Sequence, residues 1–344
     1  PLPDLLVLSL EAGAREELEA LSKLPAHERP SVLVVGPQGD LELMRLAMRA
    51  GARDFFFNPP PRDELLSAVD RAIKEKESRN ATTLRRVVVT VNAKGGAGAS
   101  FIATNVAERM ASHLKSKVAL LDMDLQFGYL AANLSVQAND GLHQALESIG
   151  TLDGVALEGW AAKHKSGVHI FGNTHRQLLL TRDFPEEPLD RLLSLLTRTY
   201  GHVVIDIPRH IDHVFAMCVQ HADTVVIVLQ QNVAQLRDAR ALITILQRDL
   251  ALRDEQIVVV VNRWSNKALV SLKDIQQGLR RPHLHTIAND FKNVSQSLNL
   301  GVPMHEINSR AGITRHLDTL ARTVGGIEAE KKGFLRRLLG SNKE

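Results

Sequence analysis

The sequence predicts an α/β protein whose larger part is a doubly wound, mainly parallel sheet. Two observations carry this prediction. From residue 86 onward, short β-branched apolar runs alternate with helical patterns, and such alternation is typical of a parallel sheet covered on both faces. A glycine-rich stretch at residues 93–100, "AKGGAGAS", separates the first of these strands from a helix. A turn of this kind is how a chain cradles a phosphate group.

Composition allows two domains and excludes several classes of protein. The chain has 344 residues, 44% of them hydrophobic and 24% charged, with a net charge of only +3, so charge alone gives no argument for nucleic acid. Cys218 is the one cysteine and lies among apolar neighbours, which excludes a disulfide framework and predicts a buried, inert thiol. Apolar runs stay short of a membrane span. Because the chain begins with Pro1, we expect it to be a piece of a longer product.

Residues 1–76 are expected to form a small domain of alternating strands and helices. Its apolar runs, such as "SVLVVG", are short and β-branched, as in buried parallel strands. Glycine closes the second helical pattern and Pro61 begins the third. The charged stretch 74–85 is interpreted as a helix tail followed by a linker over 77–85. The expected strands are 5–10, 31–36 and 53–58, and the expected helices are 12–24, 40–52 and 61–77.

Residues 86–328 are expected to form the larger domain. Ligands of such sheets bind at the carboxyl ends of the strands, so the polar residues that directly follow strands are the candidates for a site. These are residues 94–100, Asp122 with Asp124, Asp206 and Asn262. The expected strands are 87–91, 118–121, 168–171, 202–205, 224–229 and 257–261.

The glycine-rich loop has most of the parts of a phosphate loop. Its three glycines leave room for backbone N–H groups to face an anion, and the helix beginning near Ser100 adds its positive end. Ser100 is placed to offer its hydroxyl to Mg²⁺. Ala99 stands where an ordinary phosphate loop has lysine, while Lys94 keeps a positive charge at the opening of the loop. The alternative is a tight turn that binds nothing.

Three further strand ends favour the nucleotide site over that alternative. Asp124 follows one strand together with Asp122, and Asp206 follows another, as a Mg²⁺-associated carboxylate would. Asn262 ends a third strand and can both donate to and accept from a purine edge. Each of these residues alone could be a helix cap or turn former. Their occurrence at successive strand ends predicts one site for a nucleotide.

This set of motifs resembles the MinD/ParA family of deviant Walker-A ATPases over roughly residues 86–325. The resemblance implies that Lys94 reaches the ATP of a second subunit, that Asp124 positions the attacking water, and that Asn262 binds adenine. It implies ATP/ADP and Mg²⁺ as cofactors and a homodimer formed across ATP. The implied metal ligands are Ser100, Asp124 and Asp206, and the implied nucleotide-binding residues are Gly95, Gly96, Ala97, Gly98, Ala99, Ser100, Phe101, Asn262 and Arg263.

Within this family the chain is most similar to the CpaE/TadZ type of pilus-assembly proteins. The similar stretches are "KGGAGAS", "LDMDLQFGYL" and "VVIDIPRHID", while Tyr129 stands where that branch often carries an acidic residue. The resemblance implies a cytoplasmic protein at the inner membrane or cell pole that localises or assembles the Flp/Tad pilus secretion machinery. With Ala99 in the loop, we expect at most a weak ATPase. The alternatives are a nucleotide-stabilised scaffold without turnover, and a ParA-like ATPase that partitions DNA or cargo or positions flagella.

Residues 1–74 resemble the later part of a response-regulator receiver, and "AMRAGARDFFFNPPPRDELLSAV" carries the resemblance. The phospho-acceptor aspartate is replaced by Ser9, the switch hydroxyl position falls on Gly36, and the lysine before proline is Asn58. Without these groups we expect no phospho-signalling. We expect these residues to form a degenerate, partial receiver domain that is used for docking or dimerisation.

The last residues, 329–344, contain a short basic amphipathic pattern. At about 100° per residue the apolar side chains share one arc and the arginines lie outside it, which suits an anionic lipid surface. The resemblance to the membrane-targeting helix of MinD favours lipid over a helix packed on the protein itself or a frayed end. The residues concerned are Phe334, Leu335, Arg336, Arg337, Leu338 and Leu339.

Two remaining polar clusters are weaker candidates. His283 and His285 are expected in a loop, where metal binding would need further ligands. Arg280–Arg281 and Lys267 with Lys273 could contact DNA, but a solvated helix face is the expectation because no basic stripe is present. DNA is therefore not expected as a partner.

Overall fold

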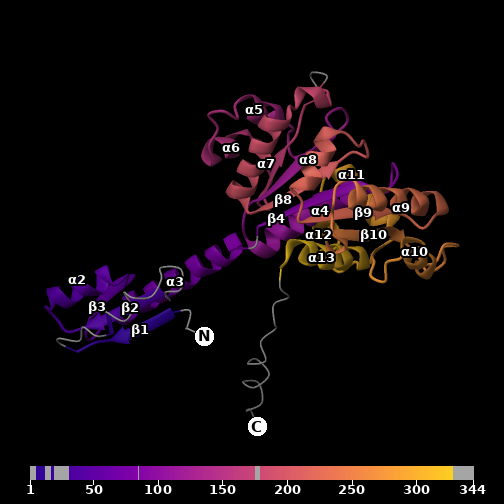
Figure 1. The fold of residues 1–344 in the computed structure, drawn as a ribbon. Coiled ribbons are helices and arrows are strands. Elements are labelled where there is room, and N and C mark those ends of the chain that lie inside the picture. The colour runs from indigo at the N-terminus through magenta and orange to yellow at the C-terminus, as the bar shows by residue number, and fades with distance from the viewer. Residues whose placement is uncertain (1–4, 12–16, 19–30, 84, 175–178, 328–344) are drawn as a thin grey trace, which may run out of the picture. The chain divides into compact units, whose positions relative to one another are not determined.

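The structure is a computed structural model of the 344-residue chain, and it describes residues 5–11, 17–18, 31–83, 85–174 and 179–327. The chain divides into two compact units, Pro1–Thr83 and Leu84–Glu344, each visible in Figure 1. The predicted amphipathic tail at 329–344 and most of the expected helix at 12–24 lie outside the described residues. In the described part of the chain, no helix is both long enough and apolar enough to cross a bilayer.

The first unit contains a three-stranded parallel sheet in the order β1-β2-β3. Asp40 caps α2 by accepting a hydrogen bond from the Leu43 amide at 2.9 Å. One prediction is wrong: α3 was expected to end at residue 77, yet it continues to Thr83. Residues 78–83 hold neither glycine nor proline to stop a helix. The elements are β1 (Leu5–Ser9), β2 (Ser31–Gly36), α2 (Leu41–Arg49), β3 (Asp54–Phe57) and α3 (Arg62–Thr83).

The second unit contains an eight-stranded sheet in the order β11-β10-β9-β4-β8-β5-β7-β6. Its strands pair in parallel except for β6, which runs antiparallel to β7. The predicted mainly parallel, doubly wound sheet is confirmed. The strands are β4 (Arg86–Asn92), β5 (Val118–Asp122), β6 (Ala162–Lys163), β7 (Val168–Phe171), β8 (His202–Ile207), β9 (Thr224–Leu229), β10 (Ile257–Trp264) and β11 (His285–Ala288).

Helices cover both faces of this sheet because its strands are apolar on both sides (Figure 1). Successive β4 residues point to opposite faces: Val87 and Val89 pack with α5 to α10, whereas Val88 packs with α4, α12 and α13. Cys218 is fully buried in the first of these cores, as predicted. The helices are α4 (Ala99–Leu114), α5 (Gly141–Glu147), α6 (Gly154–Trp160), α7 (Glu186–Tyr200), α8 (His213–Gln220), α9 (Val233–Arg248), α10 (Leu272–Leu279), α11 (Phe291–Leu300), α12 (Met304–Ile307) and α13 (Gly312–Gly325).

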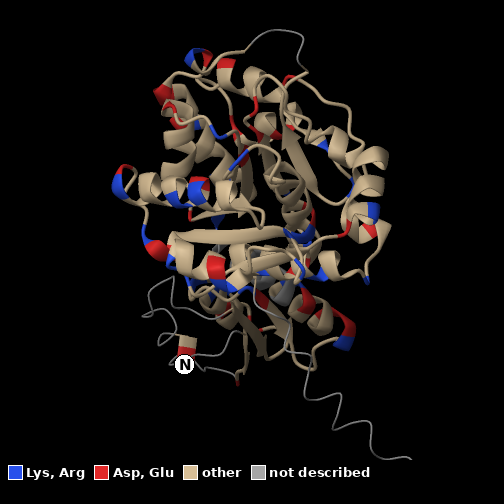
Figure 2. Ribbon diagram, turned by 90° about the vertical axis from the view of Figure 1, so that its right-hand side faces the viewer, with Lys and Arg blue, Asp and Glu red and all other residues tan. Residues whose placement is uncertain are grey.

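Two predictions near the end of the sheet are wrong. His285 was expected in a loop, but it begins β11, which pairs with β10. Arg281 was expected on a solvated helix face, but it is buried, where its guanidinium donates to Asp254 at 2.6 Å and to the carbonyl of Ile257 at 3.0 Å. Arg281 thus ties the end of α10 to the start of β10. In the view of Figure 2, Lys and Arg are interspersed with Asp and Glu.

Candidate nucleotide-binding site

The register of three central strands brings the predicted acidic residues to one edge of the sheet. Asp206 on β8 lies beside Thr90 on β4 and beside Asp122 on β5. The glycine-rich loop leaves β4 at the same edge and leads into α4, which begins at Ala99. The loop and the carboxylates, far apart in sequence, therefore meet as predicted from parallel strands.

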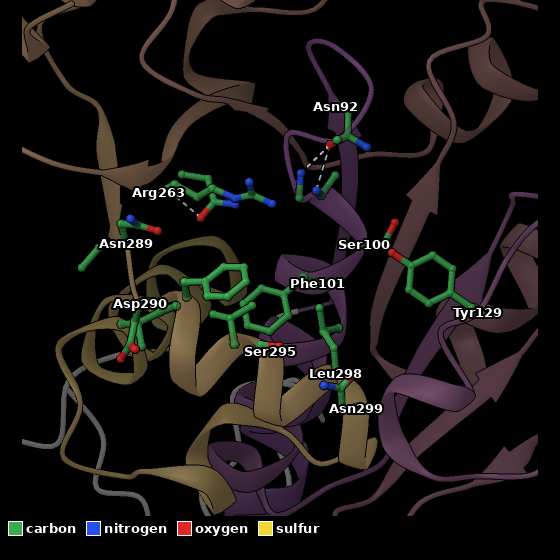
Figure 3. Close-up of a pocket in the computed structure, with 18 residues that line it drawn as sticks. Asn92, Ser100, Phe101, Tyr129, Arg263, Asn289, Asp290, Ser295, Leu298 and Asn299 are labelled. Carbon is green, nitrogen blue, oxygen red and sulfur yellow. Dashed lines mark hydrogen bonds between the residues drawn. The ribbon is translucent and has the colours of Figure 1, made fainter. Parts of the chain in front are cut away.

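The loop is held in shape by two asparagines. The side-chain oxygen of Asn92 accepts hydrogen bonds from the backbone amides of Gly98 and Ala99, each at 2.9 Å (Figure 3). The side-chain nitrogen of Asn262 donates to the carbonyl of Ala97 at 2.8 Å. The sequence-based prediction missed Asn92, although it is the last residue of β4, directly before the loop; Asp206 and Asn262 likewise lie within the last three residues of β8 and β10.

Gly96 and Gly98 both have a positive φ, and at Gly98 a side chain would also meet another residue. The φ of Gly98 is +107°, and a Cβ built there would lie 2.4 Å from the Asn262 side-chain nitrogen. A side chain at this position therefore strains the backbone and displaces Asn262. At Gly95 a Cβ would meet no atom within 4 Å.

We expect Gly98→Ala to lower the free energy of unfolding by about 2–3 kcal/mol, because backbone strain and a lost buried hydrogen bond add together. Urea denaturation of the nucleotide-free protein measures the effect. Gly95→Ala is the matched control and should stay within about 0.5 kcal/mol of the wild type. Equal losses in the two variants would contradict the assigned conformation of the loop.

Asp206 is the buried acidic centre of the site. Thr90 donates its hydroxyl to Asp206 at 2.9 Å, and the Ser100 hydroxyl lies near enough to this carboxyl to favour its charged form. Burial raises the pKa of Asp206 to about 7; the nearby Asp122 and Asp124 carboxylates add to the rise, while the hydrogen bonds from Ser100 and Thr90 oppose it. A hydroxyl beside clustered carboxylates offers the oxygen ligands that Mg²⁺ prefers. The residues present therefore fit a magnesium ion.

The two aspartates after β5 have different contacts. Asp122 is buried, and its carboxylate accepts hydrogen bonds from the amides of Leu130 at 3.0 Å and Asp124 at 3.3 Å. Asp124 is partly exposed and accepts from the amide of Phe127 at 3.0 Å. Asp122 thus fixes the path of residues 123–130, and Asp124 lies on that path with access to solvent.

Lys94 does not point at the loop's own anion site in this structure. Its ammonium lies 3.4 Å from a carboxylate oxygen of Asp238 on α9. Arg209 donates to the same oxygen at 2.9 Å and to the carbonyl of Ala93 at 2.6 Å. Hydrogen bonding from Arg209, with a smaller effect of Lys94, lowers the pKa of Asp238. Asp238 therefore holds together the start of the loop and the segment after β8.

A pocket of about 340 Å³ opens beside the loop (Figure 3). Phe101, Arg263 and Asn262 line it, but both polar atoms of the Asn262 side chain are paired within the protein, with Ala97 and with the Arg263 amide. The opposite wall comes from α11 and the residues before it, none of which the sequence-based prediction singled out. These wall residues include Asn289, Asp290, Phe291, Ser295, Leu298 and Asn299.

The histidine pair lies apart from this site. Within the described residues, no group of three or more His, Cys, Asp or Glu side chains could hold a metal ion. His283 and His285 are not among the residues that line the pocket.

The glycine-rich loop between β4 and α4, on a mainly parallel sheet with carboxylates at the same edge, defines a P-loop domain. The AAA_31 family of AAA domains matches residues 85–256, half of the chain, and the chain belongs to this family. Septum site-determining protein MinD of Escherichia coli (strain K12) is 25% identical over 279 residues, which cover 75% of this chain and 100% of that relative.

Solved structures share the fold. A ParA family ATPase from Chlorobium tepidum superposes with a TM-score of 0.64 at 22% identity, covering 69% of this chain and 98% of that one. The septum site-determining protein MinD from Pyrococcus horikoshii, solved with Mg-ADP, gives a TM-score of 0.59 at 20% identity, covering 71% of this chain and 99% of that one. These likenesses show that the chain shares the fold of these two proteins.

Proposed function

We propose that this chain binds ATP with Mg²⁺, dimerises around the nucleotide, and localises or assembles a Flp/Tad-type pilus secretion machine at the inner membrane or cell pole. The observation that carries the proposal is the meeting of the glycine loop, Ser100 and Asp206 at one edge of the sheet, with Ala99 in place of the usual lysine. ATP binding is then retained while hydrolysis is slow or absent.

Each part of the site has a role in this proposal. The backbone amides of residues 95–100 bind the phosphates, and Asn262 with Arg263 lies on the side of the base. Ser100, Asp206 and Asp124 would hold Mg²⁺, which would offset the charge of the phosphate oxygens. Asp124, being accessible to solvent, orients a water molecule for attack. Without a lysine at position 99, less of the charge developed in hydrolysis is stabilised.

Lys94 is proposed to act on the nucleotide of the second subunit. Its side chain is half exposed, and its ion pair with Asp238 is long at 3.4 Å. Arg209 donates to the same Asp238 oxygen at 2.9 Å, so Asp238 keeps a cationic partner and Lys94 can leave it at little cost when a second subunit brings a triphosphate.

Analytical ultracentrifugation with and without Mg²⁺-ATP tests the dimer. Wild-type protein should dimerise with the nucleotide, and Lys94→Ala should lose at least tenfold in dimer affinity. Lys267→Ala removes an exposed lysine outside the site and should behave as the wild type. Dimerisation of Lys94→Ala at wild-type affinity would contradict the role given to Lys94.

Three measurements separate this proposal from its rivals. Phosphate release distinguishes a slow ATPase from a scaffold that holds ATP without turnover. Ala99 favours the scaffold as well, because it replaces the lysine that would support hydrolysis. Sedimentation with anionic lipid vesicles, with and without residues 331–344, distinguishes a membrane role from DNA partitioning. Electron microscopy of host cells lacking the protein shows whether surface pili are lost.

The first unit is proposed to be a docking or dimerisation module. Ser9, Gly36 and Asn58 lie at or just after the carboxyl ends of β1, β2 and β3. None of the three is a carboxylate or a lysine, so these three positions lack the groups with which a receiver takes up a phosphoryl group.

A further inference from the structure

A cavity of about 220 Å³ at the carboxyl end of β7 contains a buried amide without a partner. Asn173 lies two residues after β7 and lines this cavity. The residue is 8% exposed, and within the described part of the chain neither its side-chain nitrogen nor its side-chain oxygen has a hydrogen-bond partner. Buried polar atoms are nearly always paired, because a donor or acceptor that leaves water without a partner costs free energy. The Asn173 amide therefore indicates a partner that the described chain does not supply.

The rest of the cavity wall is mainly apolar and built from small residues. Leu130 and Ile170 contribute the larger apolar side chains. A volume of about 220 Å³ is below the usual range of about 300–1,000 Å³ for pockets that take drug-sized ligands, so the cavity suits a smaller molecule. The small residues, which leave this space unfilled, are Gly128, Ala131, Ala132, Ala138, Ala162 and Gly172.

The other buried polar groups at this cavity have partners within the chain. Asn139 donates its side-chain N–H to the carbonyl of Trp160 at 2.9 Å, and Asp122 accepts from the Leu130 amide at 3.0 Å. Asp122 also places a carboxylate at the wall, and this charge disfavours an anionic ligand. Asn173 is therefore the group to which a neutral ligand would bond.

The chemistry of an asparagine side chain selects among neutral ligands. Its amide offers N–H donors and a carbonyl acceptor side by side. A carboxamide presents the same two groups, so the pair can form two hydrogen bonds at once. Water can also pair with Asn173, but an apolar wall gives further water molecules few partners. A molecule that joins a carboxamide to an apolar body matches both the amide and the wall.

We propose that this cavity is a further ligand site, which takes a small neutral molecule with a carboxamide group on an apolar body. The carboxamide pairs with Asn173, and the body packs against Leu130 and Ile170. The site does not rest on the proposed function, since none of these contacts involves a nucleotide. Tyr129 lines both this cavity and the nucleotide pocket, so the two sites share one segment of chain.

NMR titration of the nucleotide-free protein tests the site with two amides of different size, isobutyramide and benzamide. Each amide is compared at pH 8 with the carboxylate and with the methyl ketone of the same shape. Neither the carboxylate nor the ketone can donate a hydrogen bond to the Asn173 oxygen. Leaving a buried acceptor unpaired weakens binding by about 5- to 100-fold, and at least one amide should bind more tightly than both of its analogues by this factor.

Three variants assign the binding to this cavity. Asn173→Leu removes the amide at similar volume, so the preference for amide over ketone should disappear. The wild-type amide lacks a partner, so this variant should unfold at the same temperature as the wild type or a higher one. Ala162→Leu fills the cavity and should abolish amide binding. Asn266→Leu changes an exposed asparagine outside the cavity and should keep the wild-type preference.

Several results would overturn this inference. Equal binding of amides, carboxylates and ketones, or no binding of either amide, would leave water as the occupant of the cavity. A preference for amides that persists in Asn173→Leu would place the binding elsewhere. A lower unfolding temperature of Asn173→Leu would show that the amide is paired within the folded chain. All of these results leave the proposed function intact, whereas failure of the wild type to bind ATP would overturn the proposed function alone.

Discussion

Replacing Asp206 by asparagine should stabilise the metal-free protein by about 4 kcal/mol at pH 8. The carboxyl group has a pKa of about 7 in the folded chain and an ordinary value of 3.8, and each unit of difference is worth about 1.4 kcal/mol. Folding at pH 8 must therefore bury a charge that the asparagine does not carry. The amide keeps an oxygen for the hydroxyl of Thr90, so the contact at 2.9 Å can persist.

The direction of the pH dependence follows from which state binds the proton. Between about pH 4 and pH 7 the folded protein holds a proton on Asp206 that the unfolded chain has released, so wild-type stability due to this group falls as pH rises. The advantage of Asp206→Asn should shrink to about 2 kcal/mol at pH 5. Urea unfolding of both proteins in EDTA at pH 5 and pH 8 measures this. The same advantage at both pH values would show that Asp206 does not titrate as the burial of its carboxyl requires.

Lysine in place of Ala99 should raise the rate of ATP hydrolysis by about 100- to 1,000-fold, the usual effect of a single group that stabilises developing charge. Ala99 is the first residue of α4 and lines the nucleotide pocket. A lysine there has a stem long enough to bring its ammonium to the phosphates, where a phosphate loop normally places one. Steady-state phosphate release at saturating Mg²⁺-ATP measures the change.

The matched control is Ala99→Met, whose side chain has a similar length and no charge. Ala99 is fully buried, so either substitution costs about 1–3 kcal/mol of folding stability, and thermal unfolding should show similar losses for both. A rate that rises only in Ala99→Lys assigns the effect to charge. If both variants bind ATP and release phosphate at the wild-type rate, the missing lysine is not what slows this site.

The sequence allowed prediction of the sheet and of the residues that meet at its edge. Parallel strands place their carboxyl ends together, so the residues after the expected strands 87–91, 118–121 and 202–205 could be grouped before the strand order was known. The order itself depends on long-range pairing that no local pattern contains. The short strand β11, with His285 and Thr286 in it, lacks the apolar run that identifies a buried strand.

The parts of the site that were missed depend on chain path more than on residue type. Helix α11, which forms one wall of the pocket, follows β11 in the chain. Because β11 was not predicted as a strand, the residues of α11 could not be placed beside the loop. Tyr129 could be noted as an unusual residue, but its place on the wall of the pocket depends on the bond between Asp122 and the Leu130 amide. Asn92 could have been predicted as a site residue from the sequence, because it is a polar residue at the end of a strand.

The oxygen of Asn92 has a consequence for which anions the loop can accept. It already fills the position to which the amides of Gly98 and Ala99 point, at 2.9 Å from each, so the free loop carries its own neutral substitute for an anion. A ligand that enters must replace two satisfied hydrogen bonds, and charge-assisted bonds are roughly twice as strong as neutral ones. A singly charged ion such as chloride gains little free energy when it replaces the Asn92 oxygen. A polyphosphate gains more, because it forms charge-assisted hydrogen bonds with several amides at once. We therefore expect the loop to select among the abundant anions of the cell by their charge, before any contact with a base is made.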